Sequence, residues 1–208
     1  MRGTQRRGDE RRQQLLGAAR TLISRHELST VTYAAVCAEA GVPPSSAHHF
    51  YPDLDAVFRS LLEAHRTSFD AALMRPLRPR DCNSWQSVVE CLIDRAVQYH
   101  RAHPVEAKLA IGGRMPLHIK SVDRNADRSL ARLVLGALEE QFVVPRIPER
   151  EEIAYITTQI VDLALTLSMS EIGRITPEYA QYAKVAAIGF LRQYLGDRLE
   201  SRPHGAAR

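Results

Sequence analysis

The strongest constraint on the fold is a helical period that runs through almost the whole chain. Apolar residues recur three and four positions apart, and no stretch keeps the two-residue alternation of a strand. The pattern predicts an all-α protein of about nine helices. In the first helix, expected over residues 9–26, one face holds Leu15, Ala18, Ala19, Leu22 and Ile23.

Capping residues divide the next part of the chain into short helices. Thr32 is a good N-cap, and Gly41 can take the left-handed conformation that ends the helix begun there. Pro44 suits the first turn of a third helix, which ends before Pro52 because proline disfavours helical geometry in the preceding residue. Asp53 then caps a fourth helix.

Two breaks organise the remaining helices. Residues 76–84 contain two prolines and no apolar period, and residues 143–148 form the second break. We therefore predict a three-helix module over residues 1–52 and a larger helical domain over residues 53–208. Beyond the fourth helix, helices are expected at 85–102, 105–112, 119–142, 149–173 and 177–199.

Positive charge is concentrated near the N-terminus. Residues 1–52 contain seven Lys or Arg against four acidic residues, while the whole chain carries a formal net charge of only +4. Such an excess suits a polyanionic partner, because cationic side chains release counterions from phosphates. A solvated tail is the alternative.

Cysteine usage and hydropathy indicate the compartment. Cys37, Cys82 and Cys91 are an odd number without zinc-ligand spacing, and no apolar signal segment opens the chain. The longest apolar run, residues 160–169, contains Asp162 and is shorter than the roughly 20 residues of a membrane span. We expect a reduced, cytoplasmic protein without a membrane partner, metal or cofactor.

The most specific pattern is TYAAVCAEAGVPPSSAHHFYP, residues 32–52. A helix, a glycine turn and a short second helix form a helix-turn-helix, whose second helix lies in the major groove of DNA. A helical hairpin inside a bundle is the alternative, but it would favour apolar residues on the outward side of the second helix. That side instead holds Ser45, Ser46, His48 and His49.

The flanking residues extend this pattern to a known family. LLGAARTLISRHE, followed by TVTYAAVCAEAGVPPSSAHHFYPDLDAVFRSLL, resembles the DNA-binding domain of TetR-family regulators, in which the helices read I-L-x-A-A-x-x-L-F, T-x-x-x-I-A-x-x-A-G-V and Y-x-H-F. The resemblance covers residues 15–62 without a gap. It implies a ligand-responsive transcriptional regulator, a repressor that a small-molecule effector releases from a palindromic operator.

Some positions depart from the family pattern. Pro43 and Pro44 stand where Ser and Lys often open the recognition helix, so one usual cationic phosphate contact is absent. The other departures replace a common Tyr, a His-Phe pair and a phosphate-binding Lys, at His48, Phe50-Tyr51 and Leu54.

Position by position, the resemblance implies which residues face DNA. Serine hydroxyls can bond base edges, and histidine can reach a phosphate or a guanine edge. Arginines that precede or open the first helix could reach phosphate or the minor groove as an arm, with a solvated tail as the alternative. The arm residues are Arg6 and Arg7, followed by Arg11 and Arg12, and the recognition residues are Thr32, Pro44, Ser45, Ser46, His48 and His49.

The last two helices carry apolar stripes that suggest self-association. An intrachain core is the alternative. The family's dimer interface, two helices from each subunit, favours a homodimer through residues 149–199, with the two-fold symmetry of a palindromic operator. The stripes are Ile153, Ile156, Ile160, Leu163 and Leu167, then Ala183, Ala186, Ala187, Phe190 and Tyr194.

The resemblance also implies an effector pocket among the middle helices. Each candidate residue could instead belong to the core or the surface, and a constitutive DNA-binding protein without a ligand stays open. His100 and His103 could ligate a metal, but His103 lies at a helix end. The candidates are Trp85, Tyr99, His100, His103, Arg114, Met115 and His118.

An enzyme is the competing class. A helical-bundle carboxylate metalloenzyme would need Glu-x-x-His pairs on facing helices, and Glu63 and His65 have the wrong spacing. The sequence contains no phosphate loop, nucleophile elbow or zinc motif. We therefore predict that the protein is not an enzyme.

Overall fold

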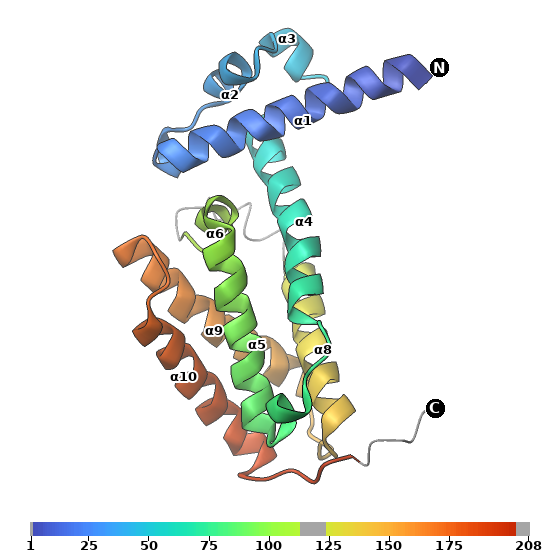
Figure 1. Cartoon of the computed structure of the whole chain (residues 1–208), viewed down its shortest axis with the longest axis vertical. Helices are drawn as coiled ribbons and strands as arrows, with labels where there is room; N and C mark the ends of the chain where they lie inside the picture. The colour runs from blue at the N-terminus through green and yellow to red at the C-terminus, as the bar shows by residue number, and fades with distance from the viewer. Residues whose placement is uncertain (1, 113–123, 203–208) are drawn as a thin grey trace.

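The computed structural model describes residues 2–112 and 124–202 (Figure 1). Nine α-helices and two short 3-10 helices make up this part of the chain, whose one extended pairing is a bridge between Phe142 and Ser201. The all-α prediction is confirmed. The elements are α1 (Arg2–Arg25), η1 (Leu28–Thr30), α2 (Tyr33–Ala40), α3 (Pro44–Ala47), α4 (Leu54–Leu73), η2 (Pro79–Cys82), α5 (Trp85–Ala102), α6 (Pro104–Ala110), α8 (Arg124–Gln141), α9 (Arg150–Ile172) and α10 (Pro177–Leu195).

α1 begins earlier than the sequence pattern predicted, at Arg2 instead of near Asp9. Residues 2–8 lack an apolar period, but they contain no proline, and Arg and Gln are good helix formers. The Arg6 side chain also pairs with Glu10 one turn later, with 3.2 Å between Nε and Oε1. The predicted start of this helix, near Asp9, was therefore too late. The helix carries Arg6, Arg7, Arg11 and Arg12.

α2 begins and ends at its predicted capping residues, whereas α3 begins at the predicted Pro44 but ends earlier than the predicted boundary before Pro52. Thr32 accepts a hydrogen bond from the backbone N–H of Ala35 at 3.2 Å. Gly41 ends α2 with φ of 64°, a left-handed conformation that glycine adopts without steric cost. Pro44 opens α3, and regular helix ends at Ala47, with turns continuing over residues 48–50.

The N-terminal helices enclose one hydrophobic core. α1 crosses the upper end of α4, and α2 packs against α1 (Figure 1). Leu109 of α6 also packs into this core, although α6 lies much later in the chain. The fully buried members from the earlier helices are Leu15, Ala19, Ile23, Val36, Ala47, Val57 and Leu61.

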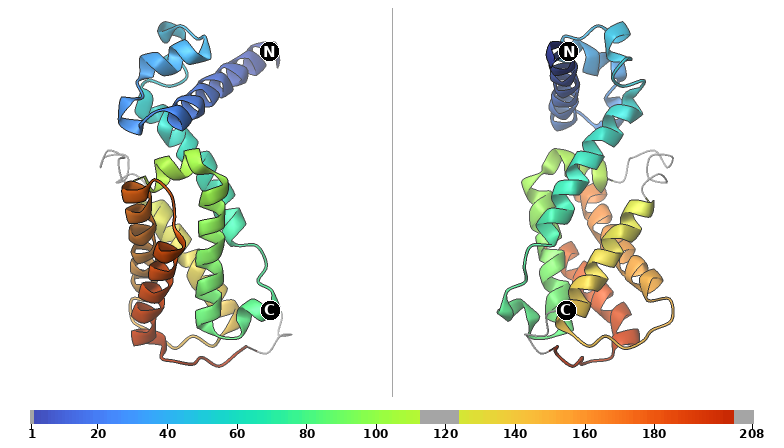
Figure 2. Two further views of the ribbon diagram at one scale, coloured as in Figure 1. Left: turned by 60° about the vertical axis from the view of Figure 1, so that its left-hand side comes forward. Right: turned by 90° about the vertical axis from the view of Figure 1, so that its right-hand side faces the viewer.

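The later helices form a second, larger core. α4 descends from the N-terminal helices beside α5, and α8, α9 and α10 complete a bundle (Figure 2). α10 packs against both α9 and α5, so one of its sides must face its own chain. Ala183 and Ala187 are fully buried on that side. These two alanines, predicted in a self-association stripe, therefore belong to the intrachain core.

α9 has a length and composition that would allow it to cross a membrane, with a mean hydropathy of 1.3 over its most apolar part. Only 22% of that part is buried. However, α9 packs against α8 and α10, and the side chains of Arg128 and Glu152 link it to α8 with 2.6 Å between Nη1 and Oε2. The helix is thus one wall of the bundle, and it leaves an apolar face exposed.

Candidate functional site

α3 presents polar side chains to solvent at one end of the molecule. Ala47 and Val42 anchor its inner side in the N-terminal core. The outer side is accessible to a large partner. All six residues predicted to face DNA are exposed or half-buried there and at the start of α2: Thr32, Pro44, Ser45, Ser46, His48 and His49.

The two histidines after α3 are held differently. The Nδ1 atom of His48 lies 2.9 Å from the carbonyl oxygen of Pro52, and its ring lies 4.9 Å from the ring of Tyr33. His49 makes an edge contact with Phe50, with 5.9 Å between ring centroids. His48 is therefore fixed by its own chain, whereas His49 is better placed to turn outward.

Arg11, predicted as part of an N-terminal arm, lies against α3. The Nη1 atom of Arg11 donates a hydrogen bond to Oγ of Ser46 at 2.6 Å. The guanidinium of the next residue, Arg12, lies 5.9 Å from the centre of the Phe50 ring. The first part of α1 thus packs along the segment that carries the recognition residues, a contact that no sequence period reveals.

α4 and α5 bring a second group of side chains together. Tyr99, His100 and His103, which were predicted to line an effector pocket, lie close in space, and Tyr99 stacks on His103 with centroids 4.1 Å apart. His65 and Phe69 of α4 complete the group, with centroids 5.6 Å and 5.0 Å from that of His100. We call these five residues the histidine cluster.

Two imidazoles in this cluster are buried and have ring nitrogens without hydrogen-bond partners. His65 and His100 are 8% and 6% exposed, and both nitrogens of His65 and Nδ1 of His100 have no hydrogen-bond partner in the described residues. Burial lowers the pKa of His65 to about 4, partly opposed by Glu106, and the pKa of His100 to about 3, with repulsion from His65 and His103 adding to the effect. Both rings are neutral at pH 7.

The other predicted effector residues lie apart from the histidine cluster or beyond the described chain. Trp85 is fully buried at the first position of α5, where Nε1 donates to the carbonyl oxygen of Gly196 at 3.2 Å. Arg114, Met115 and His118 fall outside the described residues. Within them, no group of three or more His, Cys, Asp or Glu side chains could hold a metal ion.

α6 connects the histidine cluster to α1. Glu106 accepts a hydrogen bond from Arg20, with 2.9 Å between Oε1 and Nε. Lys108 donates to the carbonyl oxygens of Ile23 and His26, at 3.2 Å and 2.7 Å, near the C-terminal end of α1. α6 starts directly after His103, so one short helix lies between the histidine cluster and these contacts with α1.

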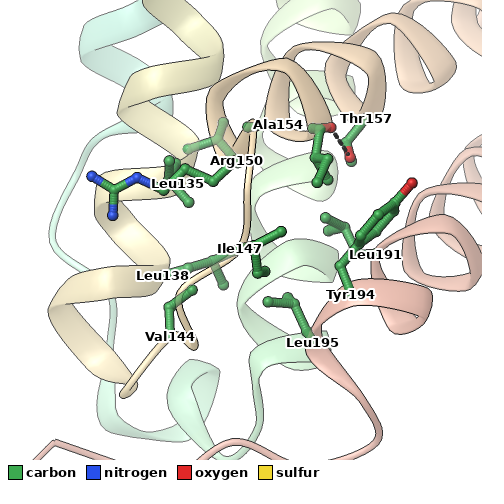
Figure 3. A pocket seen from close by; sticks show the side chains of 12 residues that line it. Leu135, Leu138, Val144, Ile147, Arg150, Ala154, Thr157, Leu191, Tyr194 and Leu195 are labelled. Atoms are coloured by element: carbon green, nitrogen blue, oxygen red, sulfur yellow. Dashed lines mark hydrogen bonds between the residues drawn. The ribbon is translucent and has the colours of Figure 1, made fainter.

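A small apolar pocket lies between α8, α9 and α10 (Figure 3). Its volume of about 30 Å³ is far below the roughly 300 Å³ of a typical small-molecule site. Leu138, Ile147 and Leu195 point toward one another, while the guanidinium of Arg150 points away and donates to Glu139 at 2.7 Å. This pocket is a packing gap of one or two water volumes and shares no residue with the histidine cluster.

The larger helical part matches a known family. Residues 83–195, more than half of the 208-residue chain, match the model described as Tetracyclin repressor-like, C-terminal domain. The chain belongs to the TetR family. No curated protein matches it.

Several solved structures have the same fold as this chain. One is a TetR-family transcriptional regulator from Streptomyces coelicolor, with 15% identity and a TM-score of 0.64 over 89% of this chain and 99% of that one. Another is a TetR transcriptional regulator from Rhodococcus sp. RHA1, with 17% identity and a TM-score of 0.63 over 90% and 97%. The flavonoid-responsive regulator FrrA gives 17% identity and a TM-score of 0.55 over 95% and 100%.

Membership of the TetR family decides between a transcriptional regulator and an enzyme. Its members are transcriptional regulators and not enzymes, which agrees with the sequence prediction.

In this TetR-family regulator, α9 and α10 also share an exposed apolar face. Three large side chains there are 59% to 61% exposed: Leu163, Tyr182 and Val185. Ala186 and Tyr194 of the predicted stripe are exposed as well, in contrast to Ala183 and Ala187. Large contiguous apolar patches on folded proteins are typical of interaction sites.

Proposed function

We propose that this TetR-family protein is a ligand-responsive repressor that binds a palindromic operator as a homodimer in the cytoplasm. The observation that carries the proposal is the geometry of α3 and the turn after it, which are anchored by Ala47 and offer Ser45 and His49 to solvent. We assign DNA binding to residues 1–52, and effector binding and dimerisation to residues 53–208. The boundary concerns function, since Leu61 and Leu109 pack into the N-terminal core.

Operator binding is tested by measuring the affinity for a duplex that carries the protein's own promoter region, at a series of salt concentrations. Several phosphate contacts should give a clearly negative slope of log affinity against log salt concentration. A sequence-scrambled duplex of equal length serves as the control and should bind more weakly. An affinity that does not change between low and physiological salt would contradict a DNA-binding role.

The homodimer is proposed to form through the α9–α10 face, within residues 149–199. Leu163 and Val185 are too exposed to stabilise the monomer, and burying them against a second copy removes apolar area from water. Two-fold pairing of this face would also place two α3 helices for two operator half-sites.

A charge placed on this face should separate the subunits. Leu163→Asp would put an unpaired carboxylate into the interface, which is costly, while leaving the monomer core untouched. Leu133→Asp is the matched control, because Leu133 is 40% exposed on α8, outside the proposed interface. Light scattering should give a monomer for the first variant and a dimer for the second. A dimer for both would overturn this interface.

The histidine cluster is our candidate for the effector site. Buried polar atoms nearly always have partners, so the three unpaired nitrogens of His65 and His100 mark where polar groups of a ligand would bind. The rings of Phe69 and Tyr99 favour a flat aromatic molecule. Neutral imidazoles can each donate and accept, so we expect a neutral aromatic effector with hydroxyl or ring N–H groups.

Effector binding is proposed to shift the protein toward a state with incompatible spacing of the recognition helices. α6 transmits the change, because it follows the cluster directly and holds α1 through Glu106 and Lys108. A ligand with higher affinity for that state lowers operator affinity by the same factor by which the operator lowers ligand affinity.

Resorcinol is a suitable first probe, with benzoate as the anionic comparison. At millimolar concentration resorcinol should raise the melting temperature of the wild type and of His26→Phe, an exposed-histidine control, because ligand binding stabilises the folded state. His100→Phe should lose this response. If neither probe changes the melting temperature or duplex affinity, the proposed ligand class is wrong and constitutive DNA binding is favoured.

A further inference from the structure

We call the six residues predicted to face DNA the recognition surface. Arg11 lies beside this surface, although it comes from α1. Its Nη1 atom donates to Oγ of Ser46 at 2.6 Å, across 35 positions of sequence. Arg11 is exposed and Ser46 is half-buried, so the pair lies at the edge of α3 and not inside the module.

Neighbouring contacts hold the backbone of α1 near Arg11 against Phe50. The Arg12 guanidinium lies over the ring of Phe50, 5.9 Å from its centre. One turn before Arg11, a Cβ atom added at Gly8 would lie 3.7 Å from Cε1 of the same ring. Because α1 is a continuous helix here, the backbone of Arg11 is held against the recognition segment and cannot swing as an arm would.

The recognition segment lacks a cation of its own. Residues 43–50, PPSSAHHF, contain no Lys or Arg. Two other nearby arginines face carboxylates, since Arg25 pairs with Glu39 at 4.0 Å and Arg59 lies 3.8 Å from an Asp53 oxygen. A serine hydroxyl alone is a poor reader, because it can bond to several different base edges.

We propose that Arg11 is a specificity-determining residue that reads a guanine in the major groove from its place beside Ser46. The inference rests on the proposed operator binding by α3. A guanidinium carries five N–H donors in a rigid fork, so a bond to the serine hydroxyl leaves others for O6 and N7 of guanine. Ser46 is the positioning residue, which orients the guanidinium that α3 itself lacks.

Selection from a randomised duplex library tests this with full-length protein. The wild type should enrich a palindromic consensus with one G·C pair in each half-site that depends on Arg11. Arg11→Ala should lose the preference at that pair, on the order of 10- to 100-fold, and keep the others. Arg11→Lys should also relax that position, because lysine lacks the fork, while it retains more of the overall affinity.

Two further variants separate reading from simple charge. Ser46→Ala should weaken the preference for the same base pair, because the Arg11 guanidinium loses the hydroxyl that orients it. Arg7→Ala removes the same charge one helical turn earlier and should keep every position of the consensus. If Arg11→Ala weakens all sequences equally and keeps the full consensus, Arg11 touches only phosphate and the inference is overturned. If the wild type enriches no consensus at all, operator binding itself fails.

Discussion

The polar groups of the recognition surface and of the histidine cluster differ in solvent exposure and in hydrogen bonding. On α3 and in the turn after it, Ser46 and His49 are reached by water, and Ser46 already has a partner in Arg11. Between α4 and α5, His65 and His100 are buried with nitrogens that nothing in the described residues satisfies. Substitutions at the first site should therefore change affinity at constant stability, whereas changes at the second should alter stability even without a ligand.

The largest expected effect is acid destabilisation through the histidine cluster. With pKa values of about 4 and about 3 in the folded state against an ordinary 6.5, His65 and His100 bind protons more readily in the unfolded chain. The free energy of unfolding should therefore be unaffected above pH 6.5. It should fall by several kcal/mol as the pH drops from there toward 4, at about 1.4 kcal/mol per pKa unit.

Chemical denaturation at fixed protein concentration and a series of pH values measures this dependence. The double variant His65→Phe with His100→Phe should lose most of it, because Glu106 and His103 are then the remaining titratable groups at the cluster. His49→Phe, on the exposed surface, should keep the wild-type profile. If the wild type, the double variant and His49→Phe lose the same free energy of unfolding on acidification, the buried histidines do not cause the acid destabilisation.

At the recognition surface the expected loss is in binding. Ser46→Ala or His49→Ala should each cost about 1 to 3 kcal/mol on the operator and leave non-specific affinity nearly intact. Both side chains lie outside the core, so the free energy of unfolding should change by less than about 0.5 kcal/mol. Competition between operator and scrambled duplexes gives the affinities. Full operator affinity in both variants would mean that α3 does not read the bases.

Short-range chemistry explains what the sequence could predict. Thr32, Gly41 and Asp53 act on backbone groups within a few residues, so the ends of α2 and the start of α4 were readable from the chain alone. The start of α1 was not, because residues 2–8 have no apolar period, and good helix formers extend the helix without one.

Contacts between helices explain what the sequence could not predict. Tyr99 and His100 lie on one predicted helix, so the sequence alone places them near each other, whereas His65 reaches them only through the packing of α4 on α5. Periodicity identifies an apolar stripe without showing what covers it. On α10 the stripe divides, with Ala187 turned toward α9 and α5 and Ala186 toward solvent.

A smaller effect should follow from removing one unpaired polar ring. His100→Phe replaces a buried imidazole with an apolar ring of similar shape, which is neutral or stabilising when the lost nitrogen had no partner. At pH 8 we expect a gain of about 1 kcal/mol, or roughly 2–4 °C in melting temperature for a chain of this size. His26→Phe should show no gain. A clear loss of stability in His100→Phe would mean that the imidazole is satisfied in solution.

The smallest predicted effect concerns Arg7, which lies on α1 one turn before Arg11. If Arg7 only neutralises phosphate, Arg7→Ala should weaken operator and scrambled duplexes by the same factor. It should also make the slope of log affinity against log salt less negative by about 1 for each phosphate that is no longer neutralised. Arg80→Ala is the charge-matched control, since Arg80 lies on η2, far from α3 in the fold. Its slope should equal that of the wild type. A change of slope in both variants would mean that net charge causes the effect. If Arg7→Ala instead weakens binding to the operator alone, Arg7 contacts bases and not only phosphate.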